Sequence, residues 1–279
     1  MNNIPSHRPA RNKTTAHLIT ILLILVTMFP FLWLVQMSLK TPRQIFTMPP
    51  EFIFMPTFEN YLALFQESSF VRYFSNSFIA STSATILSLI IGVPAAYALS
   101  RTAMKAEKTI ALWVLTSRMA PPIAFAIPFF LMYRNLGLID TRIGLITVYL
   151  TFNLSLVIWM MRTFFDGIPR ALEEAAYIDG AGLLGTFLRI TLPLTGPGIA
   201  TTAIFCFLFS WNDFFYSLIL TRSHAMTAPV AIVNFMNYEG WEWGKITAGS
   251  VVIMLPVILF SLLVRKYLIR GLTAGALKN

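Results

Sequence analysis

Long apolar segments constrain this chain more than any other feature of its sequence. A helix needs about 20 predominantly apolar residues to cross a bilayer, and six segments meet that requirement. They are 17–39, 74–100, 109–133, 143–164, 200–220 and 246–264. Charged residues make up only 12% of the chain, against about a quarter in an average soluble domain. The sequence therefore predicts an all-α, polytopic membrane protein with six transmembrane helices in a single domain, 1–279.

The distribution of Lys and Arg predicts how these segments are oriented. With the N-terminus inside the cell, thirteen basic residues fall in inner segments and six in outer loops, which leaves Arg72 and Arg118 near or within spans. Basic residues favour the cytoplasmic side of a membrane, so both termini are expected in the cytoplasm. The predicted inner segments are the tails 1–16 and 265–279, the short loop 101–108 and the long loop 162–199. The predicted outer loops of significant length are 40–73 and 221–245.

Composition and motifs argue against several classes of function. The net charge of +9 is spread singly between apolar runs, which does not favour a nucleic-acid partner. Cys206 and the three histidines, His7, His17 and His224, lie far apart in the predicted topology, so no metal or nucleophilic site is expected. The stretch 240–245 lacks the spacing and the hydroxyl residue of a phosphate loop. We therefore expect no enzyme activity, no bound cofactor and no ATP hydrolysis by this chain itself.

The inner loop 162–199 has the pattern of two short helices joined by a glycine turn. Glu173 and Glu174 suit the first turn of a helix, where carboxylates interact favourably with the helix dipole. Gly180 and Gly182 are expected to stop this helix, and a second helix, 183–190, is expected to end at Leu192-Pro193. The spacing alone fits two interpretations: an amphipathic helix that anchors the loop on the membrane, or a docking surface for another protein.

One motif in this loop resembles a known family pattern. Glu174-Ala175-Ala176, three residues, Gly180, nine residues and then Ile190-x-Leu192-Pro193 is similar to the EAA motif of binding-protein-dependent ABC importers. In that family the motif marks the membrane subunits and forms the coupling helix, which docks on the ATPase subunit. The resemblance implies that the docking residues are Glu173, Glu174, Ala175, Ala176, Asp179, Gly180, Leu192 and Pro193.

Other segments extend the resemblance to the smaller permease of maltose-type carbohydrate importers, with a type I ABC importer permease fold. These segments are 210–214 (SWNDF), 238–244 (YEGWEWG) and 270–278 (RGLTAGALK). The resemblance implies a bacterial inner-membrane location and a second six-helix permease in a heterodimer. It also implies two ATPase subunits that use ATP and Mg²⁺, and a periplasmic or lipid-anchored solute-binding protein that delivers a sugar, polyol or modified sugar. The residues expected to face the binding protein are Asn237, Tyr238, Trp241 and Trp243.

Polar residues within the spans are the candidates for the translocation path. These are Arg118, Asn153, Trp211, Asn212 and Asp213. Charged groups in a bilayer need a partner or a water-filled cavity. Arg118 is expected to pair with Asp213 or to bind substrate, beside a helix broken at Pro121-Pro122. Asp213 and Asn153 also fit an interhelical hydrogen bond. The alternative function is a self-contained secondary transporter. Charged relays within the spans and inverted repeats would be expected in such a protein, and neither is visible in the sequence.

Overall fold

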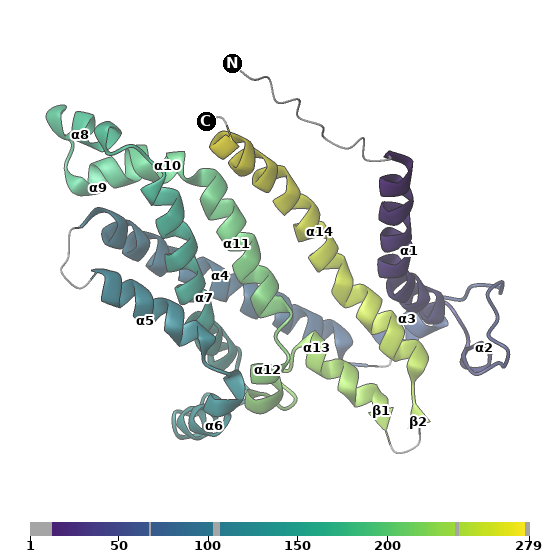
Figure 1. The fold of residues 1–279 in the computed structure, drawn as a ribbon. Coiled ribbons are helices and arrows are strands. Elements are labelled where there is room, and N and C mark those ends of the chain that lie inside the picture. Colours follow the sequence, from purple (N-terminus) through teal and green to yellow (C-terminus); the bar gives the residue numbers. More distant parts are fainter. Residues whose placement is uncertain (1–12, 67, 103–106, 238–239, 277–279) are drawn as a thin grey trace.

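The computed structural model describes residues 13–66, 68–102, 107–237 and 240–276, and within them the chain is a helical bundle with one small β-hairpin (Figure 1). The longest helices are α1 (Lys13–Ser38), α4 (Phe70–Arg101), α7 (Arg142–Asp166), α11 (Gly196–Trp211) and α14 (Trp243–Ala276). Shorter helices are α2 (Pro42–Ile45), α3 (Glu59–Gln66), α5 (Glu107–Met119), η1 (Pro122–Phe125), α6 (Ala126–Asn135), α8 (Arg170–Ile178), α9 (Leu183–Thr186), η2 (Phe187–Thr191), α10 (Leu192–Leu194), α12 (Phe215–Leu220), α13 (Ala228–Ala231) and η3 (Ile232–Phe235). The strands β1 (Met236–Asn237) and β2 (Gly240–Trp241) pair antiparallel.

Four helices of the described chain are individually long and apolar enough to cross a membrane. They are Thr15–Ser38, Phe70–Arg101, Arg142–Asp166 and Trp243–Leu263. Two more candidate spans are bent pairs: Thr109–Met119 with Pro122–Asn135, at 90°, and Leu183–Leu194 with Gly196–Trp211, at 75°. The predicted break at Pro121-Pro122 is confirmed, because α5 ends at Met119 and a 3₁₀ turn follows. The described residues thus contain four to six candidate spans.

The prediction of one continuous helix over 200–220 is wrong. Helix α11 ends at Trp211, and α12 begins at Phe215. The Asp213 carboxylate accepts hydrogen bonds from the backbone N–H groups of Tyr216, at 3.4 Å, and Ser217, at 3.0 Å. A short acidic side chain that satisfies the free N–H groups of a first turn favours a new helix start over continuation. Asp213 is therefore a capping residue at a break in the span.

Helix α4 lies at the centre of the bundle and packs against α7 and α11. The face that it buries carries small residues, among them Ala80, Ala84 and Ser88, which allow neighbouring helices to approach closely. Gly92 requires this closeness, because a Cβ atom there would lie only 2.7 Å from Val157 Cγ1.

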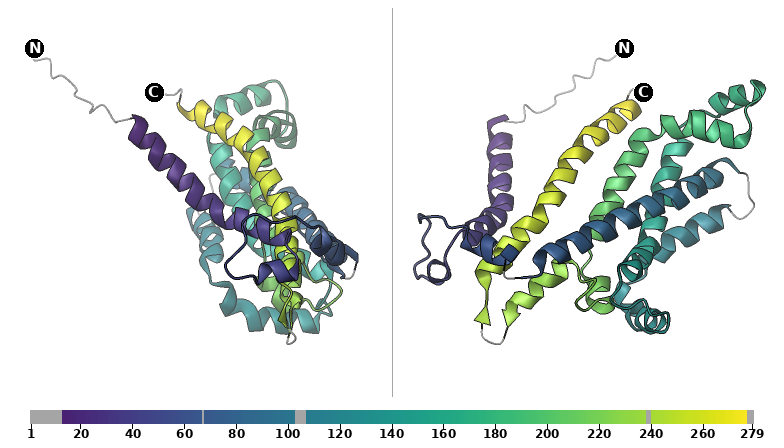
Figure 2. Two further views of the ribbon diagram at one scale, coloured as in Figure 1. Left: turned by 90° about the vertical axis from the view of Figure 1, so that its right-hand side faces the viewer. Right: turned by 180° about the vertical axis from the view of Figure 1, so that it is seen from behind.

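Helices α1 and α14 meet at their outer ends and then diverge (Figure 2). At the meeting point the Asn60 amide of α3 donates hydrogen bonds to the carbonyls of Ser38, at 2.9 Å, and Lys40, at 2.8 Å. Gly244 packs directly against Asn60, where a Cβ atom would collide with the amide. Beyond this contact, none of the apolar window of α1 is buried within the chain.

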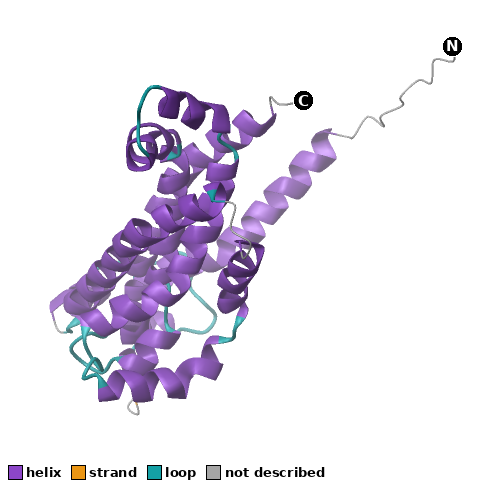
Figure 3. Ribbon diagram, turned by 90° about the vertical axis from the view of Figure 1, so that its left-hand side faces the viewer, coloured by secondary structure: helices purple, strands orange, loops and turns teal. Residues whose placement is uncertain are grey.

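The connections gather at the two ends of the bundle (Figure 3). The hairpin formed by α8 and α9 projects at the end where α1 starts and α14 finishes, while α6, α12 and the β-hairpin lie at the opposite end (Figure 1). The hairpin of α8 and α9 and the β-hairpin therefore lie at opposite ends of the long helices.

A carboxylate ties two loops together at the end of the bundle that carries α6 and α12. Asp140, which has a φ of +56°, accepts hydrogen bonds from four consecutive backbone N–H groups, those of 222–225, at 2.9–3.2 Å. Partial burial raises the pKa of Asp140, but these four donors outweigh burial and hold the pKa at about 2. The charged form of Asp140 therefore stabilises this end of the fold.

We predict that Asp140→Asn destabilises the protein by about 2 kcal/mol, because a neutral amide oxygen replaces a carboxylate that accepts four hydrogen bonds. The measurement is thermal unfolding in detergent. Since the pKa is lowered on folding, the contribution of Asp140 is complete above the usual value of 3.8 and is lost as the pH falls towards 2. The difference between wild type and variant should therefore shrink on acidification. Glu51→Gln, an exposed acidic residue, is the matched control; equal effects of both substitutions would contradict the prediction.

Candidate functional site

The inner hairpin begins with α8 and turns at Gly180, as predicted. Gly180 has a φ of +84°; its N–H donates to the Tyr177 carbonyl at 3.1 Å, and the Ala181 N–H donates to the Ala176 carbonyl at 2.9 Å. These two bonds form a Schellman motif, which favours glycine at the left-handed position. The turn is thus set by local chemistry.

The second half of the hairpin differs from the prediction. Gly182 does not stop a helix but precedes α9 in extended conformation. The helical run does not end at Leu192-Pro193; it continues through η2 and α10 to Leu194. The segment η2 is π-helical, and this wider turn accommodates a proline that would otherwise clash with the preceding turn. The chain then bends by 75° into α11.

Burial divides the predicted docking residues into two groups. Glu173 and Ala176 face the bundle, at 4% and 5% exposure, and Leu192 packs partly into the inner core cluster. The exposed members are Glu174, Ala175, Asp179, Gly180 and Pro193. The prediction that Glu173 and Ala176 lie on the docking face is therefore corrected, because the helix turns both side chains inward.

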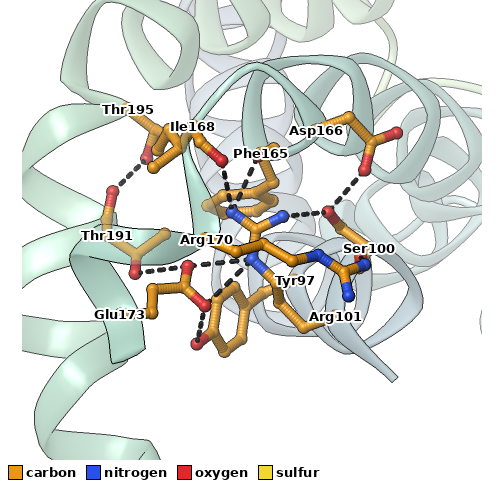
Figure 4. A network of polar contacts seen from close by, with 10 residues as sticks. All are labelled: Tyr97, Ser100, Arg101, Phe165, Asp166, Ile168, Arg170, Glu173, Thr191 and Thr195. Atoms are coloured by element: carbon orange, nitrogen blue, oxygen red, sulfur yellow. Dashed lines mark hydrogen bonds and ion pairs between the residues drawn. The ribbon is translucent and has the colours of Figure 1, made fainter. Parts of the chain in front are cut away.

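Glu173 is held by an ion pair with Arg101 at the inner end of α4 (Figure 4). The Arg101 Nε–H donates to both carboxylate oxygens, at 2.9 and 3.0 Å. The Thr191 hydroxyl of η2 donates to the same carboxylate at 3.0 Å. Side-chain exposures of 10% for Arg101 and 5% for Glu173 leave little room for water, so each charge depends on the other.

Arg101 also binds the end of α7 (Figure 4). Its Nη2 donates to the carbonyls of Phe165, at 2.9 Å, and Ile168, at 3.2 Å. The carbonyls at a helix C-terminus lack intrahelical donors and carry partial negative charge. One guanidinium thus joins α4, α7 and α8. Sequence reasoning counted Arg101 only as an inner basic residue, because its partner Glu173 is 72 residues away and no local pattern links them.

The outward surface of the hairpin is apolar at its tip. Ile178 is 85% exposed, and Leu183 and Leu184 are 65% and 68% exposed. The exposed carboxylates of Glu174 and Asp179 flank this patch. Exposed apolar side chains rimmed by charge are typical of a protein-binding surface.

Two predicted translocation-path residues lie inside the bundle instead. Trp211 is fully buried, and its indole N–H donates to the Ile253 carbonyl of α14 at 3.1 Å. Asn153 is also fully buried and donates to the Ser210 hydroxyl at 2.9 Å. Both side chains connect helices within this chain and are not accessible to a solute.

Arg118 and Asp213 do not form an ion pair in the described part of the chain. The Arg118 guanidinium lies over the Phe209 ring, 4.6 Å from its centre, a cation–π contact. Asp213 accepts a hydrogen bond from the Tyr149 hydroxyl at 3.2 Å in addition to its two bonds from α12. The side chains of Asn212 and Arg118 retain access to the surface.

The predicted outer loop forms a hairpin beside a groove. Asn237 pairs with Gly240, and Tyr238 lies outside the described residues. Trp241 is 51% exposed and contacts Trp243, with ring centres 5.0 Å apart. Both indoles line a groove of about 770 Å³ that α2 and α3 complete. This surface offers aromatic rings and polar groups to a partner.

Residues 88–273 match the family described as the inner-membrane component of binding-protein-dependent transport systems. The chain belongs to this family.

Relatives that align with nearly the whole chain support this family assignment. The trehalose transport system permease protein SugB of Mycobacterium tuberculosis is 36% identical and covers 97% of this chain and 99% of its own. The trehalose/maltose transport system permease protein MalG of Thermococcus litoralis is 35% identical, covering 93% and 94%. The sulfoquinovosyl glycerol transport system permease protein SmoH of Agrobacterium fabrum is 32% identical, covering 92% and 91%. The permease is therefore an inner-membrane transport subunit.

Solved structures agree with the fold. A chain of a bacterial ABC transporter that imports the acidic polysaccharide alginate superposes with a TM-score of 0.75 at 25% identity, covering 93% of the permease and 98% of that chain. A second alginate transporter structure, in complex with an alginate pentasaccharide-bound periplasmic protein, gives a TM-score of 0.66 at 20% identity, covering 91% and 96%. The permease thus has the fold of an ABC importer membrane subunit.

We predict that Gly180→Val disrupts the hairpin, because valine at a φ of +84° costs about 1–2 kcal/mol. The expected result is an inserted protein whose inner hairpin is cleaved faster by protease in detergent. Gly182→Val is the matched control, because Gly182 has an ordinary φ of −77° and open space around it. Equal protection of the two variants would count against the turn assignment.

We predict that Arg118 and Asp213 act independently. Each has its own partners, so the stability effects of Arg118→Met and Asp213→Asn should add to within about 0.5 kcal/mol in a double-mutant cycle. Thermal unfolding of the purified permease provides the measurement. Rescue of one substitution by the other would reveal a pair and contradict the arrangement described above.

Proposed function

We propose that the permease forms one half of the translocation pathway of an ATP-driven importer for a sugar, polyol or modified sugar. The observation that carries the proposal is the inner hairpin, which presents an exposed apolar tip while its other face is bonded into the bundle. Such a surface suits a partner that moves the membrane helices. ATP and Mg²⁺ would be used by two ATPase subunits, and the permease itself would bind no cofactor and catalyse no reaction.

The proposed topology has six spans with both termini in the cytoplasm. The start of α1 and the end of α14 lie at the same end of the bundle as the hairpin (Figure 1). Counting each bent helix pair as one span gives six. The basic residues of the predicted inner segments favour the same orientation.

The proposed partners are a second, different permease and a solute-binding protein. The apolar window of α1, of which nothing is buried within the chain, fits contact with lipid and with the second permease. The surface of the outer hairpin and groove supports contact with the binding protein through Asn237, Tyr238, Trp241 and Trp243. A related alginate transporter has been solved with its periplasmic protein.

The proposed substrate class follows the relatives, which are named for trehalose, maltose and sulfoquinovosyl glycerol. Of the path candidates, Arg118, Asn212 and Asp213 remain in the proposal, because Asn153 and Trp211 are fully buried. The Asp213 break places a polar turn between α11 and α12, where a sugar hydroxyl would find hydrogen-bond partners.

For the test, the permease is co-expressed with the proposed ATPase and the proposed second permease. We predict that a complex purifies intact and hydrolyses ATP, whereas the permease alone does not. Ile178→Asp should release the ATPase, because a charge at the centre of an apolar contact must be desolvated. Ile53→Asp, at a 98% exposed outer position, should leave the complex intact. ATP hydrolysis by the isolated chain, or an intact complex with Ile178→Asp, would refute this assignment.

A further inference from the structure

The contact between Arg101 and Glu173 is the most deeply buried of the ion pairs described in this structure. It lies between two helix ends: Glu173 is in the first turn of α8, and the carbonyls of Phe165, in the last turn of α7, and of Ile168, in the connection that follows, lie on the other side. A planar guanidinium has several donors in fixed directions and so fits both ends at once. The hairpin is therefore held by a group that belongs to α4.

The opposite end of α4 is bonded to the outer loop that precedes α13. The Asn76 amide donates to the carbonyls of His224, at 2.8 Å, and Met226, at 3.0 Å. The Ser77 hydroxyl accepts a hydrogen bond from the Ala228 N–H at 2.8 Å. Both side chains are buried. The loop bound in this way continues through α13 and η3 into the β-hairpin.

Helix α4 thus connects the outer loop to the inner hairpin through buried polar contacts at both ends. Its 32 residues correspond to about 48 Å of α-helix, which exceeds the thickness of a bilayer's hydrocarbon core. Between the two ends it packs against α7 over small residues, so the two helices have little freedom to slide independently.

We infer that Arg101 is a positioning residue for energy coupling: through it the inner hairpin moves as one body with α4 and α7, and docking of a protein on the outer loop is transmitted to the ATPase. The inference rests on the proposed function. Without Arg101, the hairpin keeps its docking tip but loses its bond to the helix that reaches the outer loop.

The first experiment measures ATP hydrolysis by the reconstituted complex. The rate without the binding protein is compared with the rate in its presence, and the binding protein is used as purified, with its endogenous ligand. Arg101→Met and Glu173→Gln should each leave a complex with basal hydrolysis but without stimulation. Arg101→Lys, which keeps the charge with fewer donors, should recover part of the stimulation. Arg134→Gln, an exposed arginine on α6, should behave as wild type. Wild-type stimulation in Arg101→Met, or basal and stimulated rates that fall together with the yield of complex, would overturn the inference.

The second experiment measures the distance between the hairpin and α4 by electron spin resonance of paired labels. Leu188→Cys and Ile91→Cys are exposed positions on the two elements, and the native Cys206 is buried. One narrow distance should persist with and without ATP and vanadate, and Arg101→Met should lose it. A distance that changes with nucleotide in the otherwise native protein would disprove motion as one body. The nucleotide-free distance can also be measured in the isolated permease. Failure of the permease to assemble with an ATPase would therefore refute the proposed function without deciding the inference about Arg101.

Discussion

The buried ion pair between Arg101 and Glu173 is the interaction on which the inner half of the structure depends. Breaking such a pair by removing one partner typically costs about 3–5 kcal/mol, because the other charge stays buried without compensation. Here the guanidinium also satisfies two carbonyls at the end of α7. The hairpin is therefore fixed to the membrane helices by this ion pair together with apolar packing, in which the Phe187 ring lies against Tyr97 and Phe165.

Helix α4 gives the rest of the bundle its geometry. Small residues along its buried face permit close contact with α7 and α11, and in a bilayer such contact replaces the hydrophobic driving force between helices. Helices α1 and α14 meet only at their outer ends and leave apolar surface towards lipid or a partner. The bundle thus has a closely packed centre of α4, α7 and α11 and a less buried periphery of α1 and α14.

Two interrupted spans place polar groups at the membrane level. Pro121 and Pro122 separate α5 from α6, and Asp213 caps α12 after the break at Asn212. Non-helical backbone is tolerated at such depth where protein or a water-lined cavity satisfies it. Arg118 lies one turn before the proline break, against the Phe209 ring. These breaks expose backbone polar groups within two spans of a chain that has few charged residues.

The sequence by itself determined the apolar segments, the break at Pro121-Pro122, the turn at Gly180 and the family motif. Each of these features depends on the chemistry of residues that lie close together in the chain. Tertiary structure alone decided which side of α8 faces the bundle, so Glu173 and Ala176 lie inside it. It also decided that Trp211 is buried and that Asp213 caps the helix that begins at Phe215. Arg101 finds Glu173 only when α4 and α8 meet, 72 residues apart, and no sequence period encodes a contact between elements so distant.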